Sequence, residues 1–561
     1  MGIMRTLWLL TALVMCVEAS WAVEAHKDWR SALKPKGEPG PELVLASEGK
    51  SLYVILLPAS PTTQERKAAS DLAHWLREMT GARFAVTAER PGHEPTKKVI
   101  SIGRTRLLAG TGVAEANADL GEEGYAIAVK GDALFLLGGS KRGPINAVYA
   151  LLEEDLGCRW YDRSSATIPK VRDLRFRPVP RQFVPVLEIR DPFYWDAFDG
   201  TWSLRNRTNA PAAAIPEQWG GNINYALFVH TFNTLVPPDL YFKDHPEYFS
   251  ELGGERRPVQ LCLTNADVLR ITIERVKEIL RKNPHAEIIS VSPNDGTGYC
   301  ECAKCRAIDD AEGSKSGTLI QFCNGVADAI RTEFPGVKIS TLAYLGTFMP
   351  PKTIRPRDNV AIQLCTDSHA WSEPFLWVTE TEQFRTAMEA WQAIGATMHI
   401  WDYTVNFSHY SIPMPNMPVV TEDIRFFVGH GAKGVMLQGA YQGPGSADGL
   451  LRCWVWAKQL WDPSLDTQQL MHDFVYGYYG AAAEPVWKYN QMLWGMWEEN
   501  HSKPGSENKL RGIGIRYGPD SAFLTEEFIA KGFALFAEAG SLAKDAETMR
   551  RVKLAKLPLL Y

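Results

Sequence analysis

The sequence predicts a mixed α/β protein whose largest part is a (β/α)8 barrel of the TIM type. The prediction rests on short β-type runs that alternate with amphipathic helical stretches between residues 184 and 462. A smaller α/β domain, residues 42–180, precedes this region, and a helical region, residues 463–561, follows it. An open doubly wound sheet is the alternative fold, but the sequence lacks the Gly-rich dinucleotide-binding turn that would favour it.

The first 22 residues have the pattern of a secretory signal peptide. Arg5 supplies the positive charge, residues 7–17 are apolar, and Ser20-Trp21-Ala22 provides the small residues of a cleavage site. We therefore expect an exported protein, located in the periplasm or outside the cell. The apolar run is too short to span a bilayer and no later run is long enough, so no membrane span is expected. Residues 23–41 form a polar, Pro-rich spacer.

The composition is typical of a large globular protein. Of the 561 residues, 45% are hydrophobic and 22% are charged, and the formal net charge is −5. No long basic run is present, so we expect no nucleic-acid partner. The 18 Trp and 19 Tyr residues supply flat rings, which pack in cores and also stack on the apolar faces of sugars.

Strand and helix patterns alternate in the smaller domain. A β-type run at 52–57 precedes a helical stretch at 61–79, where Leu72 and Leu76 belong to one apolar stripe. Further strands are predicted at 84–87, 99–102, 125–129 and 133–137, and a second helix is predicted at 143–156. This alternation is typical of a compact α/β domain that ends near Pro180.

Eight β-type runs are expected to form the barrel. They lie at 186–190, 226–230, 259–263, 288–291, 338–344, 360–365, 397–401 and 434–437. Helices are expected at 266–281, 318–333, 381–394, 420–429 and 449–460. Two further helical stretches, 467–497 and 526–561, are expected to cap the barrel, and the apolar pattern still runs at the last residues, as in a sequence that stops inside a helix.

Candidate site residues follow from the barrel rule that strands point their C-terminal ends at the active site. The first strand ends at Arg190-Asp191, and the sixth at Asp367 and His369. Substrate contacts are predicted for Arg190, Trp195, His230, Asn265, Asp367, Trp401, Tyr403 and Tyr441. Either Asp367 or Asp402 can instead be a structural partner of an Arg side chain or of backbone N–H groups.

The fourth strand end carries the sharpest feature, the sequence SPNDG at 292–296. Glycoside hydrolysis needs an acid that protonates the leaving oxygen, and Asp295 offers one. When the sugar carries a 2-acetamido group, that amide can act as the nucleophile and the protein only orients it, a task that suits Asn294. The alternative is that Pro-Asn-Asp-Gly is merely a turn, because these residues dominate turns.

Three cysteines with C-x-C-x2-C spacing follow, at Cys300, Cys302 and Cys305. A structural zinc site would need a fourth ligand, either a His or a distant Cys. A disulfide, for example with Cys262 or Cys323, is equally natural in an exported protein. In both cases the expected role is to fix the loop after the fourth strand, and no catalytic metal or other cofactor is expected.

Several segments resemble the family known as domain of unknown function 4838, now partly classified as glycoside hydrolase family 163. The segments are LGCRWY at 156–161, HPEYF at 245–249, QLCLTN at 260–265, SPNDG at 292–296 with its cysteines, and LWDP at 460–463. The smaller domain also resembles the α/β domain that precedes the barrels of family 20 hexosaminidases and family 67 α-glucuronidases. Its GGSKRG segment at 138–143 belongs to that resemblance.

The resemblance implies a retaining, substrate-assisted endo-β-N-acetylglucosaminidase or β-hexosaminidase that acts on oligosaccharides or glycans. By strand position, Asp295 is then the acid/base and Asn294 orients the acetamide. The chain departs from the family where an acidic Glu-Leu pair is expected after the eighth strand, because SADGL stands at 446–450. This departure leaves the exact glycan open.

Two other functions are compatible with the same residues. An inverting α-glucuronidase-like enzyme would use Asp295 as the acid, and Asp402 or Asp367 would activate a water molecule from the opposite face. A non-catalytic glycan-binding protein could also use this scaffold, because a fold does not by itself establish an activity.

Overall fold

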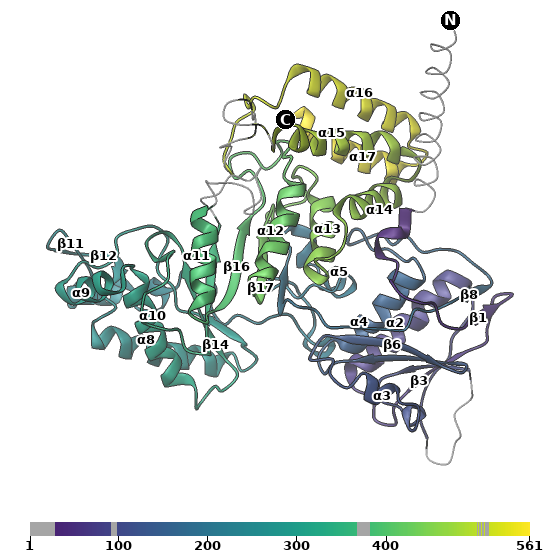
Figure 1. The fold of residues 1–561 in the computed structure, drawn as a ribbon, viewed down its shortest axis with the longest axis horizontal. Helices are drawn as coiled ribbons and strands as arrows, with labels where there is room; N and C mark the ends of the chain where they lie inside the picture. Colours follow the sequence, from purple (N-terminus) through teal and green to yellow (C-terminus); the bar gives the residue numbers. More distant parts are fainter. Residues whose placement is uncertain are drawn as a thin grey trace, which may run out of the picture. The chain divides into compact units, whose positions relative to one another are not determined.

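The computed structural model describes residues 29–90, 98–366, 382–501 and 515–561, together with the single residues 503, 507 and 510. The predicted signal peptide and the candidates Asp367 and His369 lie outside these residues. The chain divides into two compact units (Figure 1). Unit 1 comprises Met1–Phe183, Leu465–Gln491 and Ala530–Lys556, and unit 2 comprises Val184–Ser464, Met492–Ile529 and Leu557–Tyr561. In the described ranges, no helix has the length and apolar character needed to cross a membrane.

Unit 1 is built on a six-stranded sheet with the order β4-β3-β5-β7-β6-β9. The strands are β3 (Val54–Leu57), β4 (Val86–Ala88), β5 (Val99–Ile102), β6 (Tyr125–Lys130), β7 (Ala133–Gly138) and β9 (Arg181–Phe183). The first four in this order are parallel, whereas β6 runs antiparallel to β7 and β9. A second, antiparallel sheet joins β2 (Lys50–Ser51), β1 (Leu43–Ser47) and β8 (Leu174–Phe176). All predicted strands of this domain are present.

Two helices of unit 1 form where the sequence predicts them. Helix α2 (Thr63–Thr80) begins with a capping box between Thr62 and Glu65 and ends at Gly81, whose φ of 76° closes the C-terminus. Helix α4 (Gly143–Ala150) follows the tight turn from β7, and a π-helical turn at Leu151–Asp155 extends it. A Cβ on Gly138 would lie 2.0 Å from the backbone of Gly143, so this close approach requires glycine.

The predicted C-terminal helices are present but are divided between the two units. They are α14 (Thr467–Tyr479), α15 (Ala483–His501), α16 (Glu526–Leu542) and α17 (Ala546–Leu560). Helix α14 belongs to unit 1, where Arg159 donates from Nε to Asp473 Oδ1 at 2.9 Å and from Nη2 to Oδ2 at 2.7 Å. Tyr161 donates to the same carboxylate at 2.9 Å. This buried bidentate pair joins helix α14 to the N-terminal domain.

Unit 2 contains a six-stranded parallel sheet with the order β10-β17-β16-β15-β14-β13. The strands are β10 (Ile189–Asp191), β13 (Ile288–Ser290), β14 (Lys338–Ala343), β15 (Val360–Cys365), β16 (Thr397–Tyr403) and β17 (Gly434–Gln438). They match six of the eight predicted barrel strands. The predicted helices are also present, as α8 (Ala266–Lys282), α10 (Ser316–Ile330), α11 (Glu382–Ala393), α12 (Met417–Gly429) and α13 (Gly449–Trp461).

The other two predicted barrel strands differ in the structure. Residues 226–230 form no strand, and only a single parallel bridge joins Tyr225 to Ile288 of β13. Residues 259–263 mostly belong to β12 (Glu255–Leu261), which pairs antiparallel with β11 (Phe249–Leu252). The reason is local, because Gly253 and Gly254 both adopt positive φ and close a hairpin turn between the two strands. The described residues therefore form six parallel strands in place of the predicted eight.

The sheet of unit 2 is nonetheless strongly curled. Nζ of Lys338, at the start of β14, lies 3.0 Å from Oε2 of Glu188, which precedes β10. Three strands separate β14 from β10 in the sheet, so the sheet must curl to bring these atoms together. Ile189, Ile223 and Ile288 pack in one cluster, which brings the two edge strands together. The sheet is thus a partial barrel with a concave inner face, and its strand ends can surround a ligand.

Candidate active site

The strand register decides which side chains face the inside of the partial barrel. Asp191 of β10 pairs with Met436, and Met436 pairs with Trp401 of β16, so these three side chains share one face. The neighbouring Arg190 lies on the other face, where its guanidinium is 5.1 Å from the ring of Trp461 on α13. The helices cover that face, so Asp191 and Trp401 point to the inner side.

Asp402 follows Trp401 and therefore faces the helices. Its side chain is 0% exposed, and its Oδ1 accepts from the Thr366 hydroxyl at 2.6 Å and from the Tyr403 N–H at 2.9 Å. Burial raises the pKa of Asp402 to about 7. The structure corrects the prediction that Asp402 is catalytic, because its carboxyl group holds the ends of β15 and β16 together on the outer face.

Asp191 is the carboxyl group that the sequence placed at a strand end without giving it a role. It is only 1% exposed, and burial raises its pKa to about 8. Among the described residues, none forms a hydrogen bond with Asp191 Oδ1. A buried carboxyl group with a raised pKa on the inner face is an arrangement typical of catalytic sites. Sequence patterns cannot separate it from Arg190, because a register slip of one residue exchanges the two faces.

Asp295 and His230, which the sequence places at the ends of the fourth and second predicted strands, lie close together. The side chain of Asp295 is 74% exposed, and its Oδ1 lies 3.8 Å from Nε2 of His230. Nδ1 of His230 lies 2.6 Å from the carbonyl oxygen of Pro293, which can only accept, so Nδ1 carries a proton. Nε2 is therefore the nitrogen that faces the carboxylate, and its protonation would place a positive charge beside Asp295.

The backbone that carries His230 is strained. Val229 has a φ of 64°, a region that β-branched residues rarely adopt. The Val229 carbonyl accepts from Ser290 Oγ at 2.6 Å, and Ser290 Oγ lies 2.7 Å from Ser292 Oγ. Strain that the surroundings maintain is a feature of functional sites. Here it fixes the direction in which the His230 side chain leaves the backbone.

Asn294 holds the turn that presents Asp295. Its amide nitrogen donates to Asn233 Oδ1 at 2.9 Å and to the Val259 carbonyl at 2.8 Å, and its Oδ1 accepts from the Asn233 N–H at 3.0 Å. The Gln260 side chain accepts from the backbone N–H of Asn294 and donates to the backbone carbonyl of Asn294. Both amide hydrogens thus point at protein oxygens. This geometry favours a bracing role over the predicted contact with an acetamide group.

Aromatic rings lie on the same inner face. Trp401 stacks on Phe228 at a centroid distance of 6.1 Å and on Tyr403 at 5.9 Å, and its Nε1 donates to Gln438 at 2.7 Å. Phe228 follows the bridge from Tyr225 to β13 and Trp401 lies on β16, so rings from two separate segments meet on the inner face. Apolar ring faces of this kind can bind the apolar faces of sugar rings.

Other predicted contacts divide into residues near the strand ends and residues elsewhere. Trp195 is 37% exposed and donates its backbone N–H to the carbonyl of Ala440, which follows β17. The half-buried Tyr441 packs on Phe193 at 5.0 Å. These positions place Trp195 and Tyr441 near the strand ends, where a substrate contact would need them.

Two predicted substrate contacts are corrected. Arg190 is 1% exposed and donates to the carbonyls of Arg207 and Leu187, so it packs the outer face and cannot meet a ligand inside the partial barrel. Asn265 caps the N-terminus of α8, where its side chain accepts from the N–H groups of Asp267 and Val268. It follows the β11–β12 hairpin and lies at no parallel strand end.

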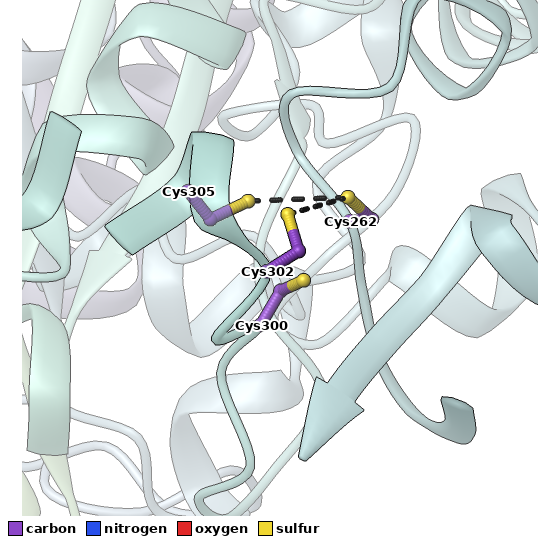
Figure 2. A group of neighbouring side chains, drawn as sticks. All are labelled: Cys262, Cys300, Cys302 and Cys305. Carbon is purple, nitrogen blue, oxygen red and sulfur yellow. Dashed lines mark hydrogen bonds between the residues drawn. The ribbon is translucent and has the colours of Figure 1, made fainter. Parts of the chain in front are cut away.

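The cysteines of the predicted loop gather with a fourth partner. Cys262 joins Cys300, Cys302 and Cys305, and the four sulfur atoms lie within 4.8 Å of one another (Figure 2). Cys323, the other partner considered from the sequence, lies outside this group and its thiol contacts the Val291 carbonyl at 3.5 Å. The group is a candidate metal site, separate from the carboxyl groups.

Unit 2 is a barrel-type α/β domain. Its parallel sheet is curled, and carboxyl groups and aromatic rings lie at the strand ends. The chain belongs to the family described as "Domain of unknown function (DUF4838)", whose model matches residues 160–491. This confirms the family that the sequence motifs indicated. No curated protein matches the chain.

Solved structures resemble the chain in fold. A family GH115 4-O-methyl-α-glucuronidase, BtGH115A, is 12% identical, with 92% of this chain and 72% of that chain covered and a TM-score of 0.53. The Flavobacterium johnsoniae chitobiase FjGH20 is 11% identical, with 92% and 91% covered and a TM-score of 0.48. The first likeness shows that the chain shares its fold with this α-glucuronidase, and at this identity it shows no more than the fold.

Proposed function

We propose that this protein is a glycoside hydrolase that cleaves glycans at N-acetylhexosamine residues by a retaining, substrate-assisted route. The observation that carries the proposal is the pair formed by Asp295 and His230, whose side-chain atoms lie 3.8 Å apart where β13 leaves the sheet. The exposed carboxyl group supplies an acid, the histidine supplies a charge partner, and the aromatic rings of the inner face supply a sugar-binding surface.

In the proposed reaction, Asp295 protonates the glycosidic oxygen while the acetamide oxygen of the substrate attacks the anomeric carbon. The C–O bond to the leaving group breaks, and a cyclic oxazolinium ion forms. Asp295, now a carboxylate, removes a proton from a water molecule that opens this ring with net retention. A protonated His230 stabilises the carboxylate between the two steps, because its charge is opposite.

In this proposal Asp191 is the second carboxyl group of the active site. It lies on the inner face with Trp401, whereas Asp402 faces the helices. A carboxyl group with a pKa of about 8 can donate a hydrogen bond to a substrate oxygen or, once ionised, accept one from the acetamide N–H. Asn294 then acts on Asp295 through the turn and not on the substrate.

The position of Asp191 also favours a second candidate function. If Asp191 activates a water molecule opposite Asp295, the enzyme inverts the anomeric carbon and no acetamide group is needed. Glucuronides are the substrates to test for this route. For either function we propose an exported enzyme, on the signal-type sequence of residues 1–22.

The two functions are separated by substrate choice and by product stereochemistry. The full chain is assayed on aryl N-acetyl-β-glucosaminide, aryl glucuronide and intact N-glycans, and the first product anomer is identified by proton NMR. Turnover of the N-acetylated substrates with a β-anomer as first product is the expected result. Turnover only of the glucuronide with inversion supports the second candidate. Sugar binding without turnover of any substrate contradicts both and leaves a glycan-binding protein.

A further inference from the structure

We propose that Cys262, Cys300, Cys302 and Cys305 bind one Zn²⁺ ion in a closed structural site. Cys262 directly follows β12, whereas the other three belong to the segment between β13 and α9 (Ala303–Glu312) and the first turn of that helix. Figure 2 shows the sulfur atoms of the two segments turned toward one another. All four side chains are buried, so water does not compete for the position among the sulfur atoms. This inference is independent of the proposed hydrolase function.

The sulfur spacing fits a tetrahedral metal better than a disulfide. A zinc ion with Zn–S bonds of about 2.3 Å holds its sulfur ligands about 3.8 Å apart. Cys262 Sγ lies 3.7 Å from Cys302 Sγ and 3.9 Å from Cys305 Sγ. A disulfide would instead bring its two sulfur atoms to about 2.05 Å of each other.

The surroundings of the sulfur atoms are suited to thiolates. Cys300 Sγ accepts from the Glu251 N–H at 3.4 Å, and Nη1 of Arg256 lies 3.8 Å from the same atom. The Thr264 hydroxyl lies 3.2 Å from Cys305 Sγ. Four thiolates around Zn²⁺ carry a net charge of −2, which the Arg256 cation partly offsets. Such outer contacts orient the ligands and tune the metal.

Helix α9 also favours negatively charged sulfur ligands at this position. Cys302 is its N-cap residue and Cys305 lies in its first turn, so the positive end of the helix dipole points at the sulfur atoms. Four sulfur ligands also fill a tetrahedral coordination shell and leave no open position for a substrate or water. Soft thiolate ligands select Zn²⁺ over Mg²⁺ and Ca²⁺. The ion therefore has a structural role.

The proposed site joins two parts of unit 2 that are distant in sequence. The β11–β12 hairpin supplies Cys262, and the segment that begins with the Asp295 turn supplies the other three ligands. Gln260, two residues before Cys262, also bonds the backbone of Asn294. Metal binding would fix both ends of this connection and with it the turn that carries Asp295.

Metal analysis of the full chain tests the proposal. The protein is purified under reducing conditions, and its zinc content is measured by elemental mass spectrometry. Each of Cys262→Ser and Cys305→Ser is compared with Cys323→Ser, which removes a buried thiol outside the group. We expect one zinc ion per chain in the wild type and in Cys323→Ser, and a loss of most of the zinc in the other two variants. Equal zinc retention in all four proteins would overturn the proposal.

Cobalt substitution provides a readout that survives if the serine variants fail to fold. The wild type with Co²⁺ is expected to show intense sulfur-to-cobalt charge-transfer bands and the visible spectrum of a tetrahedral site with four sulfur ligands. Cys262→His keeps a ligand at this position, so it should retain one ion and shift the visible bands to those of a site with three sulfur ligands and one nitrogen ligand. Two results would contradict the proposal. One is wild-type protein whose four thiols are titratable but which takes up no Zn²⁺ or Co²⁺. The other is wild-type protein in which these cysteines form two disulfides.

Discussion

Nε2 of His230 lies 3.8 Å from Oδ1 of Asp295, although the two residues belong to different segments of the partial barrel. The proton on Nδ1 is held by the Pro293 carbonyl, so the opposite nitrogen is directed at the carboxylate. The turn braced by Asn294 presents Asp295, and the strained backbone at Val229 presents His230. The relationship thus depends on two separate structural devices, and each can be tested.

Replacing His230 by Gln should lower kcat/KM by about 10²-fold, because the charge partner of Asp295 is lost. The measurement is kcat/KM on the best N-acetylated substrate. His285→Gln replaces an exposed histidine that precedes the N-terminal end of β13 and is the matched control. An unchanged kcat/KM in His230→Gln would remove this residue from the proposed mechanism.

At position 229 we expect a glycine variant to be more stable than an alanine variant, which is the reverse of the usual order. Glycine normally destabilises a folded chain by about 0.5–1 kcal/mol relative to alanine. At a φ of 64° glycine is unstrained whereas alanine is not, so Val229→Gly should be more stable than Val229→Ala by up to about 1 kcal/mol. Denaturant unfolding of both variants measures the difference. A more stable alanine variant would show that residue 229 carries no backbone strain.

Asp191 should make the protein less stable as the pH rises. Its pKa is about 8 when folded and about 3.9 when unfolded, so between these values the folded state holds a proton that the unfolded state has lost. The free energy of unfolding then falls with pH, by at most about 1.4 kcal/mol per pH unit from this group. Asp191→Asn should flatten the decline between pH 5 and 8 in urea unfolding. An equally steep decline in the variant would place the pKa of Asp191 outside this window.

Asp191 and Asp402 should differ in their effect on activity, because they lie on opposite faces of the sheet. Asp402→Asn keeps an oxygen that can accept from Thr366 and Tyr403, so we expect kcat/KM within about threefold of the wild type. Asp191→Asn should lower kcat by about 10²-fold or more. Steady-state kinetics on one substrate compares them. A larger loss in Asp402→Asn would show that the inner face has been assigned incorrectly.

The sequence predicted strand and helix positions more reliably than side-chain directions. The run VISI at 99–102 is mostly apolar and β-branched and lies between Lys98 and Gly103, so β5 forms at the predicted residues. Asp402 and Arg190 were misplaced because period-two alternation gives two faces, and only the register with β17 tells which is inside. The run at 259–263 has the composition of a barrel strand, but its nearest partner is the strand before the Gly253-Gly254 turn.

The cysteine group shows a related limit. The spacing of Cys300, Cys302 and Cys305 indicates a site, but the fourth member lies on a hairpin that the sequence assigned to the barrel. Candidates from distant segments cannot be ranked until the chain path is known. By contrast, His230 and Asp295 were both predicted at strand ends, and their side chains lie 3.8 Å apart, although residues 226–230 form no strand.

The most direct test of the account is the dependence of Asp295→Asn on leaving-group basicity. A general acid matters when the leaving group is a sugar hydroxyl and matters little when it is a dinitrophenolate, which leaves without protonation. The rate of the first step is therefore measured on both substrate types, with the exposed Asp310→Asn as the control. We predict a loss of about 10³-fold on the glycan and a far smaller loss on the dinitrophenyl substrate. Equal losses on the two substrates, or no loss on the glycan, would contradict the role of Asp295 as the acid.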